Sequence, residues 1–79
     1  MKWIIKGKYA RYIFRDRKLV CEIFEMADGS LSLFVKKENK PFIYLIEKHL
    51  KRKTIKAACN EATKIILEYI ESIKQEATE

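Results

Sequence analysis

The sequence has little of what marks a catalytic, metal-binding or membrane-spanning chain. Its 79 residues include two Gly, one Pro, two Cys and one His. So little Gly and Pro excludes a collagen or a low-complexity disordered chain. The longest uncharged apolar stretch, 42–46, is far shorter than the roughly 18 residues of a transmembrane helix. Lys2 and Lys6 interrupt the first apolar residues too early for a signal peptide. We therefore expect one small, soluble, ordered domain spanning 1–79.

The two cysteines, Cys21 and Cys59, both have apolar neighbours in sequence. A small secreted domain usually needs several disulfides, and two cysteines supply one at most. We predict two reduced, buried thiols that pack as small apolar side chains, and hence a cytoplasmic protein. One His and no Cys-x-x-Cys motif cannot provide four zinc ligands from one chain. No metal or cofactor is expected.

The sequence also lacks the constellations of an enzyme. His49, the only histidine, has no nucleophile or carboxylate near it in sequence. There is no Gly-rich phosphate loop and no nucleophile elbow. A chain of this size can hardly enclose a substrate pocket. We predict a non-enzymatic protein with no catalytic residue and no small-molecule substrate. The acidic residues of the C-terminal segment are interpreted as a solvated helix face: Glu61, Glu68, Glu71 and Glu76.

What is abundant is positive charge, with 17 basic against 11 acidic residues and a net charge of +6. The excess lies in two blocks, because 1–21 and 36–56 each carry +6 whereas 22–35 and 57–79 each carry −3. Such blocks are typical of a protein that contacts a polyanion. Lysine-rich surfaces that only maintain solubility give the same pattern.

Apolar alternation predicts an α+β fold, an antiparallel meander of three to four strands packed on one long C-terminal helix. The run 42–47 is interpreted as the fourth strand, followed by a basic connector at 48–53, although its apolar spacing also fits a helix. The short run 3–6 is either a separate strand or the start of the next one before a bulge at Gly7. The strands are expected at about 3–6, 8–15, 19–26, 30–36 and 42–47, and the helix at about 55–75.

The helix is predicted from a stripe of apolar residues at helical spacing, with Thr54 as N-cap. We expect it to lie across the apolar face of the sheet, where its small residues allow a close approach. The stripe consists of Ile55, Ala58, Cys59, Ala62, Ile66, Tyr69, Ile70 and Ile73.

The register follows from keeping apolar residues on one face, since a slip of one residue moves a strand's side chains to the other face. A two-residue turn at 16–17 sets Tyr12 opposite Cys21. A three-residue turn at 27–29 sets Cys21 opposite Val35 on the same face. The same two registers place Phe14 opposite Leu19, Ala10 opposite Ile23, Ile23 opposite Leu33, and Arg11 opposite Glu22.

The sheet face opposite this core mixes aromatic with basic residues. That composition is typical of sheets that stack bases and hold phosphates. We therefore expect a nucleic-acid partner, with DNA and RNA both open, bound by this face and by the basic cluster at 48–56. The candidate contacts are Tyr9, Arg11, Arg15 and Lys36 on the sheet, with Lys51, Arg52 and Lys53 beside it.

The same face predicts an alternative function, because large apolar patches are unusual on a monomer. The segment 41–52 as a helix, Trp3, a second copy or another protein could cover it. The alternative is a homodimer or protein-interaction module, such as a phage or mobile-element accessory protein. No membrane partner is expected. The candidate interface residues are Ile13, Val20, Phe24 and Phe34.

Overall fold

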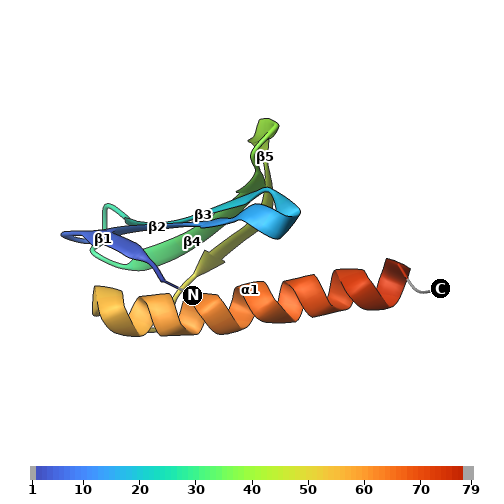
Figure 1. Cartoon of the computed structure of the whole chain (residues 1–79). Coiled ribbons are helices and arrows are strands. Elements are labelled where there is room, and N and C mark those ends of the chain that lie inside the picture. Colours follow the sequence, from blue (N-terminus) through green and yellow to red (C-terminus); the bar gives the residue numbers. More distant parts are fainter. Residues whose placement is uncertain (1, 78–79) are drawn as a thin grey trace.

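The computed structural model describes residues 2–77 and consists of one sheet packed on one helix (Figure 1). Each strand pairs antiparallel with the next, so the sheet order is β1-β2-β3-β4-β5. This confirms the predicted α+β class. The run 3–6 contributes a strand of its own, so the sheet has five strands and not three to four. The elements are β1 (Ile4–Lys6), β2 (Tyr9–Phe14), β3 (Leu19–Glu25), β4 (Leu31–Lys37), β5 (Lys40–His49) and α1 (Ile55–Ala77).

The predicted register is confirmed, but one turn differs from its prediction. Tyr12 lies opposite Cys21, and Cys21 lies opposite Val35. The connection from β2 to β3 has four residues instead of two, a 3-10 turn at Arg15–Arg17 followed by Lys18. The Lys18 N–H donates to the Arg15 carbonyl at 3.2 Å, and Lys18 takes the left-handed conformation with φ 53°. This tight turn keeps the register and adds two residues to the loop.

Glycine supplies the left-handed conformation at two other turns. Gly29, with φ 87°, ends the predicted 27–29 turn. Gly7, with φ 59°, lies between β1 and β2, so the run 3–6 contributes a separate strand and not the start of β2. Both positions favour Gly because a Cβ atom strains positive φ.

The last strand is longer than predicted. The run 42–47 is a strand and not a helix, and it extends to His49 because Ser32 of β4 pairs with His49. The predicted connector at 48–53 therefore begins only at Leu50, whose N–H donates to the Leu31 carbonyl at 2.8 Å. The register between β4 and β5 shifts after Val35.

The core lies between the sheet and α1. Its helix side includes Ala58, Ala62 and Ile66, which are fully buried. Thr54 caps the helix, as predicted, since its Oγ1 accepts from the Ala57 N–H at 3.4 Å. The sheet side consists of Ala10, Leu19, Cys21, Ile23, Leu31, Leu33 and Val35.

Candidate nucleic-acid interface

The sheet face that points away from α1 is here called the outer face. No other element of residues 2–77 covers it (Figure 1). The segment 41–52 cannot cover it as a helix, because 40–49 is β5 of the same sheet. Trp3 does not cover it either, since its ring packs on Tyr12 and its Nε1 donates to Thr63 of α1 at 3.0 Å. Two of the proposed covers are thus excluded, and the face is open.

Four aromatic rings form a continuous row across the outer face, one from each of β2 to β5. The ring centroids of Tyr9 and Phe24 are 5.1 Å apart, those of Phe24 and Phe34 5.8 Å, and those of Phe34 and Tyr44 5.4 Å. The planes of neighbouring rings are tilted by 51°, 65° and 57°. We call these four residues the aromatic row. It arises because paired residues on antiparallel strands share a face and diagonal neighbours lie within reach of large side chains.

One carboxylate lies beside the row. Glu22 Oε2 accepts a hydrogen bond of 2.7 Å from the Tyr9 hydroxyl, and Glu22 Oε1 lies 3.5 Å from Lys36 Nζ. Burial, and then the Glu22 carboxylate, raise the pKa of the Tyr9 hydroxyl. Arg11 stands opposite Glu22 in the register, as predicted. In the described chain, however, the Glu22 carboxylate contacts Tyr9 and Lys36. Glu22 therefore forms no ion pair with the Arg11 guanidinium, which can bind another group.

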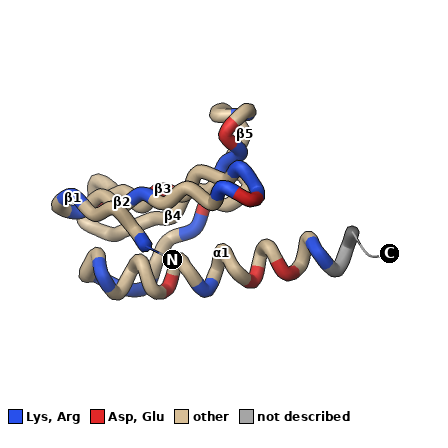
Figure 2. The backbone as a smooth tube through the Cα atoms, viewed as in Figure 1, with Lys and Arg blue, Asp and Glu red and all other residues tan. Residues whose placement is uncertain are grey.

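Basic residues gather at the end of the sheet where β2 turns into β3 and β4 turns into β5 (Figure 2). The two turns touch, since the Glu38 N–H donates to the Lys18 carbonyl at 2.8 Å. Lys36 also lies 6.0 Å from the centroid of the Tyr44 ring, at the end of the aromatic row. We call this cluster the basic end. It consists of Arg15, Arg17, Lys18, Lys36, Lys37 and Lys40.

Sequence reasoning selected two members of the basic end and missed the other four. Strand alternation predicts Arg15 and Lys36 on the outer face, but β2 ends at Phe14 and Arg15 lies in the 3-10 turn that follows it. The others lie in or beside turns, where alternation carries no information. The signal that could have found them is the pairing of Leu19 with Lys37, which brings the two turns to one end of the sheet.

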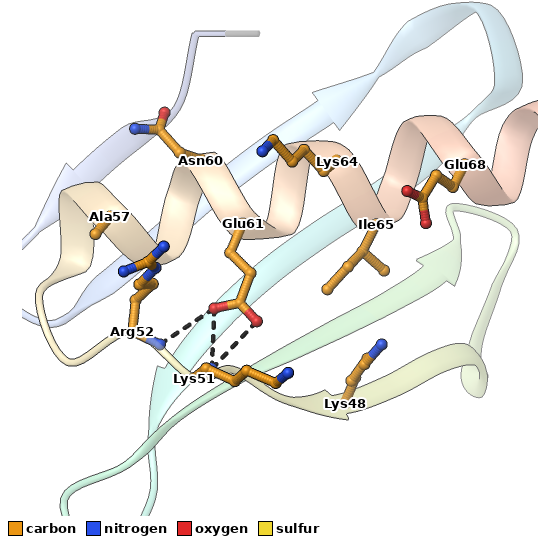
Figure 3. A pocket seen from close by; sticks show the side chains of 9 residues that line it. All are labelled: Lys48, Lys51, Arg52, Ala57, Asn60, Glu61, Lys64, Ile65 and Glu68. Atoms are coloured by element: carbon orange, nitrogen blue, oxygen red, sulfur yellow. Dashed lines mark hydrogen bonds between the residues drawn. The ribbon is translucent and has the colours of Figure 1, made fainter.

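The other predicted basic residues lie elsewhere. Lys51, Arg52 and Lys53 belong to the connector between β5 and α1. Lys51 and Arg52 line a groove against α1 (Figure 3). The structure therefore does not place them beside Tyr9 and Arg11, and the connector and the basic end are two separate basic surfaces.

The candidate protein-interface residues differ in exposure. Val20 is only 7% exposed, so neighbouring side chains cover it and it offers a partner little contact surface. Ile13 and Phe24 are 36% and 39% exposed, and Phe34 is half-buried. The most exposed apolar side chain lies outside this predicted set. It is Phe42, 93% exposed, at the start of β5.

The comparisons with known proteins add no candidate. No protein-family model, curated protein or solved structure matches this chain. Residues 2–77 hold no group of three His, Cys, Asp or Glu side chains placed to bind a metal ion. None of the helical residues described forms a stretch long and apolar enough to cross a membrane. Inference about function therefore rests on the surfaces themselves.

Proposed function

We propose that this protein binds single-stranded nucleic acid on the outer face of its sheet. The observation that carries the proposal is the aromatic row, which ends at the basic end beside Lys36. Aromatic side chains stack unpaired bases, and adjacent cations hold the phosphates of the same strand. Four rings on four neighbouring strands offer stacking surface along a path, as a single strand requires.

The charged residues of the outer face have different expected roles in binding. Arg11 is exposed and has no carboxylate partner among the described residues, so it is available for a phosphate. Lys36 and Arg15, which belong to the basic end, add further positive charge. Glu22 repels phosphates from the middle of the row, where bases are expected to stack. The backbone of the strand would therefore run along the border of the row and its bases across it.

The test is fluorescence anisotropy with labelled single-stranded DNA, single-stranded RNA and duplex DNA at low and near-physiological salt. We expect both single strands to bind more tightly than the duplex, and Arg11→Glu/Arg15→Glu to lower that affinity by about tenfold or more. The matched control is Lys56→Glu/Lys74→Glu, which changes the net charge equally on α1. Equal losses in both variants, or equal binding of all three probes, would show non-specific attraction and overturn the proposal.

A second candidate function, self-association, is favoured by the start of β5. Phe42 and Ile43 are 93% and 58% exposed, and β5 is an edge strand. Large exposed apolar side chains that lie next to each other are typical of protein–protein contacts, so the side chains of Phe42 and Ile43 favour packing against a second copy. Sedimentation equilibrium across a wide concentration range tests this candidate. A monomer at every concentration would reject it, whereas a dimer that Phe42→Ser dissociates would support it.

We further propose a reducing compartment such as the cytoplasm. Cys21 and Cys59 are both free and buried. Buried thiols of this kind serve as apolar packing groups and need no oxidising environment. Thiol titration of the denatured protein purified under non-reducing conditions tests this, with two free thiols per chain expected.

A further inference from the structure

A groove lies between β5, the following connector and α1, on the helix side of the sheet (Figure 3). Its volume is about 790 Å³, which is large enough for several residues of an extended peptide. Lys48 faces this side because it pairs with Leu33, a core residue. Its charged lining residues are Lys48, Lys51, Arg52, Lys64, Glu61 and Glu68.

The groove is positively charged although it contains two carboxylates. Glu61 is held by the main chain, since its carboxylate accepts from the Lys51 N–H at 2.9 and 3.2 Å and from the Arg52 N–H at 3.1 Å (Figure 3). These bonds fix the connector against α1 and satisfy much of the hydrogen-bonding capacity of Glu61. The side chains of Lys51 and Arg52, together with Lys48, stay free to meet an anion.

The edge of β5 beside the groove is regular. Between Ile46 and His49 the pairing with β4 runs without a shift. The irregular pairing lies in the other half of the strand, which also contains Pro41. Bulges and prolines protect sheet edges from further pairing, so the half without them is the half that can accept another strand. No strand of residues 2–77 occupies this edge.

We propose that this groove binds an extended acidic peptide of a partner protein, which pairs with β5 as a sixth strand. Alternate side chains of a strand point to one side, so carboxylates at every second position would face Lys48, Lys51 and Lys64. Ile65 supplies apolar contact between them. The main-chain donors and acceptors of the β5 edge match a peptide and not a phosphodiester chain, which favours peptide over nucleic acid here.

The probe is a labelled seven-residue peptide of alternating Glu and Val. We expect saturable binding by anisotropy, with the largest amide shifts in the ¹⁵N–¹H spectrum at Ile46–His49. Lys48→Glu/Lys64→Glu should weaken binding by about tenfold or more, because both charges face the groove. Lys56→Glu/Lys74→Glu is the charge-matched control and should change it little. A peptide with N-methyl groups at alternate backbone nitrogens should bind far more weakly.

Three outcomes would overturn the proposal. They are no binding of the probe, equal binding of the N-methylated peptide, and amide shifts at Ile46–His49 produced by a single-stranded oligonucleotide that displaces the peptide. The last outcome would identify the groove as a phosphate site. The variant Arg11→Glu/Arg15→Glu separates this proposal from the proposed function. It should lower oligonucleotide affinity on the outer face by about tenfold or more and leave peptide binding intact.

Discussion

The Tyr9 hydroxyl on β2 donates a hydrogen bond of 2.7 Å to the Glu22 carboxylate on β3. Lys36 on β4 lies 3.5 Å from the other oxygen of that carboxylate. A single Glu side chain thus links three strands on the open face of the sheet. It also holds one end of the aromatic row in place and reduces the free positive charge beside it.

Glu22→Gln is therefore expected to strengthen binding of single-stranded nucleic acid. The amide can still accept from Tyr9 but no longer offsets Lys36, so one more cation is free for phosphate. We expect a severalfold rise in affinity at low salt and a slope of log affinity against log salt steeper by about one contact. Anisotropy titrations at several salt concentrations measure both quantities. An unchanged slope would show that Lys36 does not contact phosphate.

Phe24→Ala should weaken binding without changing the salt slope. Loss of one stacking ring costs about 1–3 kcal/mol for a base, whereas phosphate contacts remain. The control is Ile13→Ala, which removes an aliphatic side chain of similar exposure, 36% against 39%, from the same face. Anisotropy with an unstructured oligonucleotide measures the difference. Equal losses for both variants would indicate general apolar contact instead of base stacking.

Ala62→Leu should destabilise the protein by roughly 1–3 kcal/mol, because Ala62 is fully buried where α1 approaches the sheet. The added side chain must push the helix away from its partners. Leu67→Ala, at a position that is 49% exposed on the same helix, serves as the control. Urea denaturation followed by circular dichroism measures both. A neutral Ala62→Leu would mean that the helix–sheet contact is looser than the structure indicates.

Cys21 should resist alkylation in the folded protein. Burial, and then the charge of Glu22, raise the pKa of its thiol to about 12, so little thiolate exists at pH 8. In the unfolded chain the thiol ionises near its ordinary pKa of about 8.5. The free energy of unfolding should therefore fall as pH rises above about 8.5, because the unfolded state loses its proton first. Mass spectrometry after iodoacetamide treatment, with and without urea, measures the protection.

The regular part of the fold could be predicted from the sequence because one physical constraint decides it. Tyr12, Cys21 and Val35 must share a face for the sheet to have a continuous core, and only one register achieves this. The helix stripe follows from the same reasoning, with Ala58 and Ala62 buried as expected. The buried residues of the strands and of the helix can thus be predicted from strand alternation and helical spacing.

The candidate surfaces were harder to predict because they depend on which segments meet in space. Lys18 and Lys37 lie far apart in sequence and reach the same end of the sheet through two separate turns. Lys51 was expected beside the outer face, but β5 continues to His49 and delivers the connector to the helix side. The Lys51 N–H donates to the Glu61 carboxylate of α1, and no pattern in the sequence marks that contact.

The chain order of the sheet and helix has a consequence for folding. All strand pairs join neighbours in sequence, so the sheet can form early from local contacts. Within residues 2–77 its core face is closed only by α1, which follows all five strands, and the bond from Trp3 to Thr63 spans 60 residues. During synthesis the five strands emerge before their cover, with Leu33 and Val35 exposed meanwhile. We therefore expect a longer delay before the helix docks to favour aggregation of the nascent chain.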